Sequence, residues 1–374
     1  MDISKVAPWS SKTVVFAKPQ EIYLPQNSSE AWLEFQFYYR EKPTWCKDEN
    51  LIVAFHQSFL PQKCSMILRK DNVKSLQTKK IGHDLVVTGN NFELKFDTVH
   101  AVISNYKFKN QNLITKGLGF NLWRAPVDND KNMQIMWEQY MVNHMCNVPE
   151  NITVDATEEC VTITCQQIFA PIILDWKIIF CTKYMIDADG VVTLEVEGTP
   201  VGTLPDCFPR VGMRFVLDRT LDTATWFGRG EKETYADCKA GYPIGVYTLP
   251  INDFYFPYVV PQETGNREDT RWFAIYGEGD TALCFIADEV LSFSALHYSQ
   301  ETLTKARHTN EIVPEEETYL CIDHKQNGLG SASWGAETLE KDRVLPVPFK
   351  FKWKLAAVKQ TELITKLEQL KGTM

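Results

Sequence analysis

Much of the chain alternates apolar and polar positions with the period of two that is typical of a strand with one face in solvent. The clearest case is 191–197, where Val192, Leu194 and Val196 alternate with polar residues. A tight turn such as Gly89-Asn-Asn91 separates neighbouring runs, because Gly and Asn tolerate a positive φ. The predicted strands are 32–39, 51–56, 84–88, 92–96, 100–107, 152–154, 161–165, 176–180, 191–197, 211–217, 272–275, 282–287, 318–323 and 349–356. We expect 51–56 to be the more fully buried strand of the first pair.

Helical spacing of apolar residues occurs in only two places. Between Met133 and His144 a stripe of Met and aromatic residues predicts an amphipathic helix, and we interpret this stripe as a packing face rather than a cofactor site. The second is 361–370, where leucines and Ile364 recur at helical spacing behind Thr361, which we expect to cap the helix. Many short strands and few helices predict an all-β protein, a large sandwich with one or two peripheral helices.

The length of 374 residues is enough for two domains. Residues 1–25 contain Pro8, Pro19 and Pro25 and are predicted to be irregular. The strands at 32–39 and 51–56 then suggest a small β-sandwich that ends near Pro61. Residues 64–80 would lead into the large sandwich.

The net charge of −9 argues against binding to nucleic acid or to an anionic membrane surface, because no cluster of Lys or Arg interrupts it. Apolar runs such as 171–174 are far shorter than the ~20 residues that span a bilayer. The first residues, Met1-Asp-Ile-Ser, show no signal peptide. We therefore expect no nucleic-acid or membrane partner.

The ten cysteines are scattered, without a Cys-x-x-Cys pair or a histidine at zinc-finger spacing. We expect reduced and mostly buried thiols, a cytoplasmic protein, and no metal site.

One glycine-rich stretch, Asn327-Gly-Leu-Gly-Ser-Ala-Ser-Trp-Gly335, is too flexible for a helix or a central strand and predicts a shaped loop. Trp334 has no apolar neighbour at strand or helix spacing. A tryptophan in this setting can offer its ring face to the C–H groups of a sugar. The alternative is that Trp334 folds back as a lid over core residues.

Three further stretches, 123–130, 226–237 and 258–267, mix arginines with carboxylates and amides. This mixture suits the recognition of a ligand with many hydroxyls, because Arg donates in pairs and amides both donate and accept. The alternative is that the charged residues form Arg–carboxylate networks that hold long loops. That alternative applies to Arg124, Asp128, Arg229, Glu233, Glu263 and Arg267.

Together these stretches resemble the C-terminal region of family 2 glycoside hydrolases, the β-galactosidases, including the evolved β-galactosidase type. Trp123-Arg-Ala-Pro-Val-Asp-Asn-Asp130 is similar to the family's Trp-Arg-Ala-Pro-x-Asp-Asn-Asp. The stretch 258–267 resembles Tyr-x-x-Pro-Gln-Glu-Asn-Gly-Asn-Arg, with Thr264 in place of Asn. The stretch 228–237 resembles Gly-x-Gly-Pro-x-Glu-Asn-Tyr-x-Asp, with Glu231 for Pro and Thr234 for Asn. Residues 308–311, 323–324 and 328–335 also fit, and the resemblance covers about residues 25–355.

The resemblance implies an immunoglobulin-like sandwich at 1–75 and a galactose-mutarotase-like supersandwich at 78–374. In the family, a tryptophan at the place of Trp334 stacks on the aglycone sugar, and the loop matching 131–134 lies at the same entrance. We therefore predict a carbohydrate site without catalytic residues. Its members are Arg124, Asp130, Asn132, Gln134, Glu263, Arg267, Ser333 and Trp334.

The family's two catalytic glutamates, and its Mg and Na sites, belong to an upstream TIM barrel. This chain shows no βα repeat that could form such a barrel and hold two catalytic carboxylates. We interpret Glu311 and 315–317 as part of a solvated turn. We therefore expect no cofactor in this chain, and a galactoside or other small sugar as ligand. The protein partner would be a catalytic TIM-barrel chain, or the chain would associate with itself. The barrel could be a separate chain, an upstream part, or absent.

Two other functions stay open at this point. An aldose 1-epimerase needs a His acid and a Glu base, for which His297 and His308 are candidates. A stand-alone sugar-binding, structural or oligomerisation module needs neither.

Overall fold

The computed structural model describes residues 6–7, 9–13, 15, 30–39, 41–47, 51–60 and 75–371. The chain divides into two compact units, residues 1–67 and residues 68–374. The predictions made for 1–25 and 61–74 lie largely outside the described residues.

In the first unit, the described residues include one antiparallel hairpin of β1 (Ala31–Tyr38) and β2 (Ile52–Leu60). Trp32 pairs with Phe59, and their rings lie 5.4 Å apart. The prediction that 51–56 is the more buried strand is wrong, since Ile52 to His56 are all exposed. Among the described residues of this unit no second sheet covers the hairpin. The immunoglobulin-like fold stays a prediction.

The second unit is all-β, as predicted, and its strands form one 16-stranded sheet. The main path runs in the order β3-β4-β5-β6-β7-β12-β17-β16-β18-β11-β10-β9-β8, with β15, β13 and β14 branching from β16. The strands of the first half are β3 (Gln77–Ile81), β4 (Asp84–Thr88), β5 (Phe92–Asp97), β6 (Val102–Phe108), β7 (Gln111–Asn121), β8 (Met145–Ala156), β9 (Cys160–Pro171), β10 (Lys177–Asp187) and β11 (Val192–Val201). Those of the second half are β12 (Arg210–Asp218), β13 (Thr223–Arg229), β14 (Ile244–Pro250), β15 (Arg267–Tyr276), β16 (Thr281–Leu296), β17 (Glu317–Gln326) and β18 (Phe349–Lys359).

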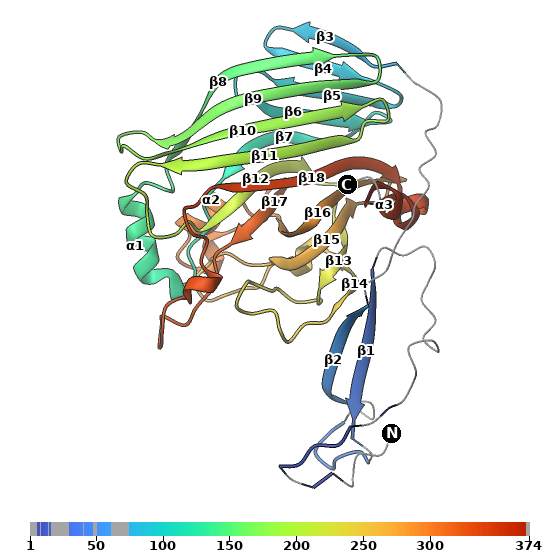
Figure 1. Ribbon diagram of the computed structural model, residues 1–374, viewed down its shortest axis with the longest axis vertical. Helices are drawn as coiled ribbons and strands as arrows, with labels where there is room; N and C mark the ends of the chain where they lie inside the picture. Colours follow the sequence, from blue (N-terminus) through green and yellow to red (C-terminus); the bar gives the residue numbers. More distant parts are fainter. Residues whose placement is uncertain are drawn as a thin grey trace. The chain divides into compact units, whose positions relative to one another are not determined.

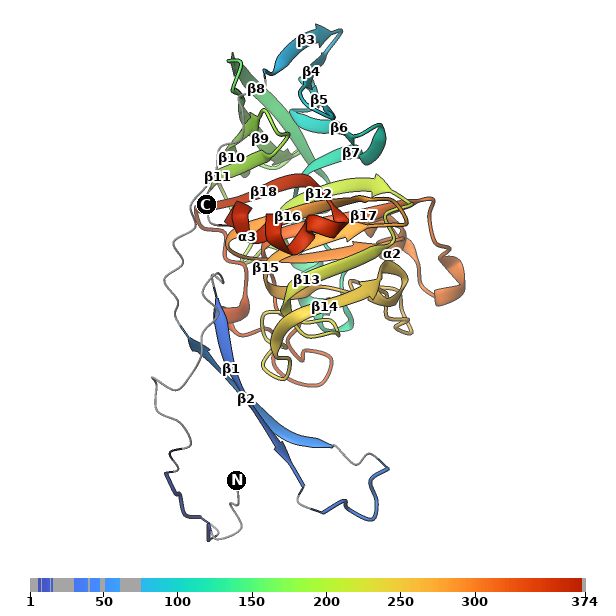
Figure 2. The same ribbon diagram turned by 90° about the vertical axis from the view of Figure 1, so that its right-hand side faces the viewer.

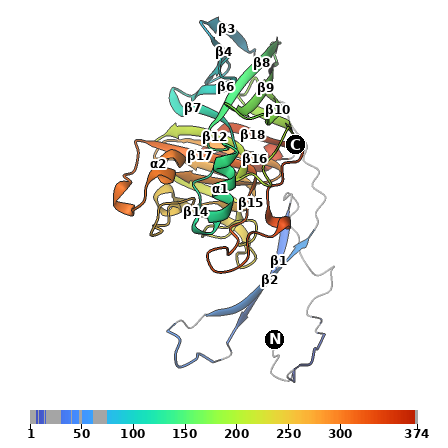
Figure 3. The same cartoon turned by 90° about the vertical axis from the view of Figure 1, so that its left-hand side faces the viewer.

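The first half of this unit is a sandwich in which β3–β7 face β8–β11 (Figures 2 and 3). Aromatic residues from both layers meet in its core, since the rings of Phe96 and Tyr184 lie 5.1 Å apart and those of Phe120 and Phe180 stack at 4.9 Å. The buried Tyr106 hydroxyl donates to the carbonyl of Gly190 across the layers, at 2.9 Å. The alternating burial of β9, β10 and β11 confirms the period-two pattern of the sequence.

Within the described residues, three α-helices lie at the periphery of this sheet (Figure 1). They are α1 (Lys131–Gln139), α2 (Gln300–Lys305) and α3 (Leu363–Lys371). The helix α3 was predicted, and its Leu367 packs in a second core cluster with Trp272 and Ile286. The six-residue α2 was not predicted.

The helix α1 ends earlier than the sequence pattern predicts. Met133 and Trp137 are buried, as a packing face requires, but residues 140–144 form turns. Met141 has a φ of +55°, and the Val142 amide donates to the Trp137 carbonyl, so the chain leaves the helix here and enters β8. Beyond Gln139, Tyr140 and Met141 of the apolar stripe are half-buried in a turn and His144 is exposed.

Four strands, β3, β7, β13 and β14, were missed. In β7 the alternation is interrupted by irregular pairing with β12 and by Gly119 at a φ of +80°. In β13 the central residues Ala224, Thr225 and Trp226 are all buried, so no polar face marks the strand. Both features remove the period on which strand prediction depends.

The nine cysteines in the described part of the chain are free thiols, and Cys64 lies outside it. Burial raises the pKa of the Cys165 thiol to about 12 and that of Cys207 to about 11, so these thiols stay protonated. Within the described residues, no helix is both long and apolar enough to cross a membrane.

We expect thiol titration of the denatured protein, without reductant, to count all ten cysteines. In the folded protein the buried thiols should react slowly and the exposed Cys146 and Cys238 first. A count reduced by two or more after denaturation would show a disulfide and contradict this prediction.

Candidate functional site

The four polar stretches singled out in the sequence converge in space and hydrogen-bond to one another. The first stretch contacts the third, since the Glu263 amide donates to the Ala125 carbonyl at 3.1 Å and the Asp128 amide to Gln262 Oε1 at 3.0 Å. The second contacts the fourth through Asp237, whose carboxylate accepts from the Leu329 and Gly330 amides at 2.9 and 2.7 Å. The predicted motifs therefore build one region of the second unit.

The second and third stretches are joined by Glu233. Its carboxylate accepts from the Gly265 amide at 2.8 Å and from the hydroxyls of Thr264, at 2.9 Å, and Tyr258. Burial, and then the bond to Glu233, raise the pKa of Tyr258, which remains a neutral donor. Thr264, which departs from the family's Asn, thus keeps a polar link between the two loops.

Arg124 joins the first stretch to the fourth from a fully buried position. Its guanidinium makes a two-point pair with Asp130, at 3.1 Å (Nε to Oδ2) and 2.7 Å (Nη2 to Oδ1), and both side chains are 0% exposed. The same group donates to the carbonyls of Asn327 and Gly328, at 2.5 and 3.1 Å. It also lies 5.7 Å from the ring centroid of Trp137 in α1. The base of the glycine-rich loop is therefore held by a desolvated, charge-assisted network.

The glycine-rich loop is also tied to residues 128–130, a 3-10 turn that precedes α1. Asn129 donates from Nδ2 to the Gly330 carbonyl and accepts the Ser333 amide, both at 3.0 Å. The Ser333 hydroxyl donates to the Asp128 carbonyl at 3.1 Å. Gly330 has a φ of +66°, which favours glycine at this position.

Trp334 is 100% exposed at the tip of this loop. The alternative that it folds back over core residues is therefore wrong in this structure. Its amide donates to the Ser331 carbonyl at 3.0 Å, and so does the Gly335 amide, at 2.6 Å. A local turn thus holds the backbone while the indole stays in solvent.

The other exposed candidates lie on α1 near the same turn. Asn132 is exposed and donates to Glu337 Oε1 at 3.2 Å, across to the segment after the loop. Gln134 is half-buried and donates to Glu138 at 2.7 Å, a contact within the helix. The side-chain amides of both residues lie near the surface, where they could also hydrogen-bond to a ligand.

Glu263 and Arg267 lie in the interior instead. Glu263 pairs with the buried Arg210 at 2.8 Å, and Arg210 Nε lies 3.6 Å from Asp323. Burial raises the pKa of Asp323 to about 7. The guanidinium of Arg267 lies over the rings of Phe254 and Trp226, at 4.3 and 5.1 Å, and burial lowers its pKa to about 10.

The predicted set therefore separates by burial. Trp334, Asn132, Gln134 and Ser333 lie at or near the surface, whereas Arg124, Asp130, Glu263 and Arg267 are buried and paired or packed. The pairs Arg124–Asp130 and Glu263–Arg210 are of the kind that the Arg–carboxylate alternative predicts, whereas Arg267 packs on aromatic rings. The four residues at or near the surface offer an open aromatic face and a hydroxyl on the loop, and side-chain amides in the first turns of α1.

Residues that sequence analysis did not select hold this site together: Asn129, Asp237, Glu337 and Arg210. Asn129 and Asp237 lay within the predicted motifs, and their ability to bind backbone amides was the available signal. Arg210 stood just before a predicted strand and carried no separate signal.

The two histidines considered for an epimerase, His297 and His308, differ in burial and in their contacts. His297 is buried, with Nδ1 3.2 Å from the Thr318 hydroxyl, and burial lowers its pKa. His308 is exposed and lies 2.9 Å from Glu311. Neither printed contact places a glutamate across a sugar-sized gap from one of these histidines.

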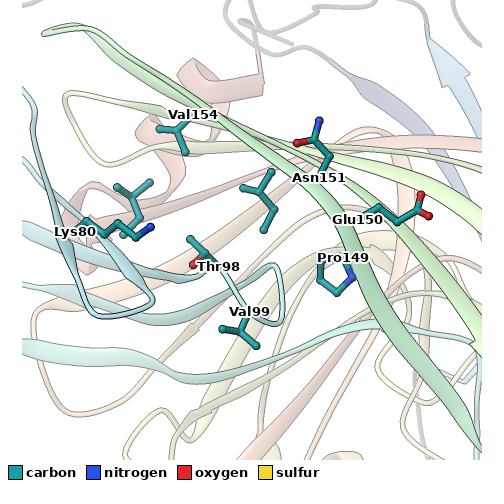
Figure 4. A pocket seen from close by; sticks show the side chains of 9 residues that line it. Lys80, Thr98, Val99, Pro149, Glu150, Asn151 and Val154 are labelled. Atoms are coloured by element: carbon teal, nitrogen blue, oxygen red, sulfur yellow. The ribbon is translucent and has the colours of Figure 1, made fainter.

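A pocket of about 420 Å³ lies elsewhere in the unit, between the edge strand β8 and the turn that follows β5 (Figure 4). Val99, Pro149, Ile152 and Val154 give it apolar walls, and Lys80 and Glu150 are its charged residues. It shares no lining residue with the four loops.

The family described as "Beta galactosidase small chain" matches residues 88–355. Among curated proteins, a beta-galactosidase of Actinobacillus pleuropneumoniae is 26% identical over 337 residues, covering 89% of this chain and 33% of the relative. One of Priestia megaterium is 27% identical over 340 residues, covering 89% and 32%. The chain thus spans about a third of the length of these relatives. Among solved structures, a putative mutarotase of Salmonella typhimurium has a TM-score of 0.43 and 10% identity, over 76% of this chain and 94% of that one.

Proposed function

Because the chain belongs to the beta-galactosidase small-chain family, we propose that it is the non-catalytic small-chain or C-terminal part of a β-galactosidase. In this role it binds carbohydrate and completes the aglycone side of an active site. The catalytic carboxylates of that site lie on a TIM barrel outside this sequence. We also propose that residues 1–75 are most or all of an immunoglobulin-like sandwich, and that the protein is cytoplasmic.

The observation that carries this proposal is the fully exposed Trp334 on a loop whose base is buried and charged. Leaving a large aromatic side chain in water forgoes roughly 1.5–3 kcal/mol of burial. The loop is held in this exposed position by hydrogen bonds. Two of its amides donate to Asp237, two of its carbonyls accept from Arg124, and Asn129 makes two further hydrogen bonds to it. Such rigidity is what a platform for a sugar ring needs, since its face is ready before the ligand arrives.

We assign the exposed and the buried residues different roles. Trp334 stacks on the sugar, while Ser333, Asn132 and Gln134 exchange hydrogen bonds with its hydroxyls. Arg124, Asp130, Glu263 and Arg267 position the loops from within and do not touch the ligand. This differs from the sequence-based expectation, which gave all eight residues to the sugar, and burial is the reason.

The rest of the reaction needs groups that these loops lack. A retaining glycosidase uses two carboxylates ~5–5.5 Å apart that flank the scissile bond. Within the four loops, Asp130 and Glu263 pair with guanidinium groups, and Asp237 and Glu233 accept hydrogen bonds from backbone amides. We therefore propose a catalytic barrel, with its Mg and Na sites, as partner, as another chain or as an upstream part.

The purified chain alone is expected to hydrolyse neither lactose nor a nitrophenyl galactoside, because the catalytic carboxylate pair is proposed to lie on the barrel outside this sequence. The assay should use the chain at high concentration, with and without Mg²⁺. A second preparation carrying Trp334→Ala serves as control, since contaminating enzyme from the host would be unaffected by it. Turnover that copurifies with this chain through two columns and falls in the Trp334→Ala preparation would contradict the proposal.

A further inference from the structure

Two turns at one end of β3–β6 bring together a set of metal-ligating side chains far from the four loops in sequence. His83 lies in the two-residue turn between β3 and β4, and Asp84 is the first residue of β4. Asp97 is the last residue of β5. The imidazole of His83 and the carboxylates of Asp84 and Asp97 each offer one ligand atom, all within 4.8 Å of one another.

The backbone geometry fixes this juxtaposition. Gly82 opens the β3–β4 turn at a φ of +62°, which suits glycine at the first position of a tight hairpin turn. Asp84 and Asp97 are direct cross-strand partners in the β4–β5 register. Thr98 donates both its amide, at 3.0 Å, and its hydroxyl, at 2.5 Å, to the His83 carbonyl, so the two turns are joined.

The charges of this arrangement are unbalanced. Like charges directly opposite each other on neighbouring strands are destabilising. Within the described residues, the ion-pairing partners of these two carboxylates are imidazoles, His83 at 3.9 Å from Asp84 and His100 at 2.6 Å from Asp97. Two carboxylates therefore face each other with no Lys or Arg paired to either of them among the described residues.

Asp97 is already oriented as a ligand. Its Oδ1 accepts the amides of Val99 and His100, at 2.7 and 3.2 Å, and its Oδ2 accepts from His100 Nδ1. A carboxylate that binds a metal ion is typically held in place by such hydrogen bonds from neighbouring groups.

We propose that His83, Asp84 and Asp97 form a surface site for a divalent transition-metal ion of the Zn²⁺ type. One imidazole nitrogen and two carboxylate oxygens suit Zn²⁺, whereas Mg²⁺ and Ca²⁺ prefer oxygen ligands alone. Three protein ligands leave a fourth position for water. His100 acts on the metal only through Asp97. Sequence analysis predicted no metal site. The proposed ligands come from two separate turns, so they show no ligand spacing along the sequence.

The site would tie the β3–β4 turn to the end of β5, beside the pocket that Thr98 and Val99 line. A metal ion that binds the folded form alone raises the melting temperature as its concentration increases. The site is independent of the proposed role in a β-galactosidase.

The test is titration of the full chain with ZnCl₂ by calorimetry, in a buffer without chelator or phosphate. We expect one Zn²⁺ per chain, a rise in melting temperature with Zn²⁺, and no competition from excess Mg²⁺. In His83→Ala, whose side chain is 64% exposed and can be removed without loss of packing, we expect Zn²⁺ binding to weaken by at least about tenfold, as removal of a metal-supporting group typically does. The matched control is His308→Ala, which removes an exposed histidine paired with one carboxylate, and it should bind like the wild type.

Loading with Co²⁺ distinguishes these ligands from the cysteines. The absorption spectrum of the Co²⁺-loaded chain should show bands of bound cobalt and no charge-transfer band of a thiolate ligand. Three outcomes would each overturn the proposal: no binding detected up to about 0.1 mM Zn²⁺ by calorimetry or by a shift in melting temperature, equal binding by His83→Ala and the wild type, or a thiolate band with Co²⁺.

Discussion

Replacement of Arg124 by alanine is expected to lower the free energy of unfolding of the large unit by about 3–5 kcal/mol, because it breaks a buried ion pair by removing one partner. Asp130 would remain 0% exposed without its cation. The carbonyls of Asn327 and Gly328 would lose their charged donor. Urea denaturation of the variant and the wild type, followed by tryptophan fluorescence, measures the difference.

The control for this experiment is Arg229→Ala. Arg229 also pairs with an aspartate, Asp269 at 2.8 Å, but both side chains are partly exposed, at 25% and 19%. We expect a smaller loss, since solvent can replace the partner. If Arg124→Ala costs no more than Arg229→Ala, the buried network does not hold the loops as described.

Replacement of Trp334 by alanine is expected to weaken galactoside or glucose binding by about 1–2 kcal/mol, roughly five- to thirtyfold. Stability should hardly change, because the side chain is 100% exposed. Trp334→Phe should keep part of the affinity, since it keeps a smaller aromatic face. Calorimetry with each sugar, and the melting temperature of each variant, give both quantities.

A control variant for this prediction is Trp9→Ala, which removes another fully exposed tryptophan from the other unit. Its affinity for sugar should equal that of the wild type. An equal effect of the two substitutions on sugar affinity, or a loss of about 3–5 kcal/mol of stability in Trp334→Ala, would show that the platform is misassigned.

Sequence alone predicted the sheet best where one face is buried and the other solvated. The runs around Val192 and Val161 show this, because their alternation follows directly from the pleat. It failed where both faces are buried, as around Trp226, and where bulges and glycines break the period, as around Gly119. The end of α1 was missed because Met141 adopts a left-handed turn that an apolar stripe does not reveal.

For the candidate site, the motifs selected four loops that the structure brings together, and the exposure of Trp334 agrees with the glycine-rich surroundings of that residue. The motifs could not separate residues at the surface from residues that are buried and hold the loops. Arg124 and Asp130 have side chains that could bind a sugar. In the structure they pair with each other, six residues apart in a turn, and both are buried. Burial of a charged group depends on long-range packing, here on Asn327 and Trp137, which local sequence does not show.

The most direct measurement of the central claim is a crystal of this chain soaked with galactose, with the sugar located by its density. The account predicts density against the indole face of Trp334, within hydrogen-bonding distance of Ser333 or Asn132, and none beside His297. Sugar bound between a histidine and a glutamate away from this loop, or no bound sugar at saturating concentration with the loop free of lattice contacts, would contradict it.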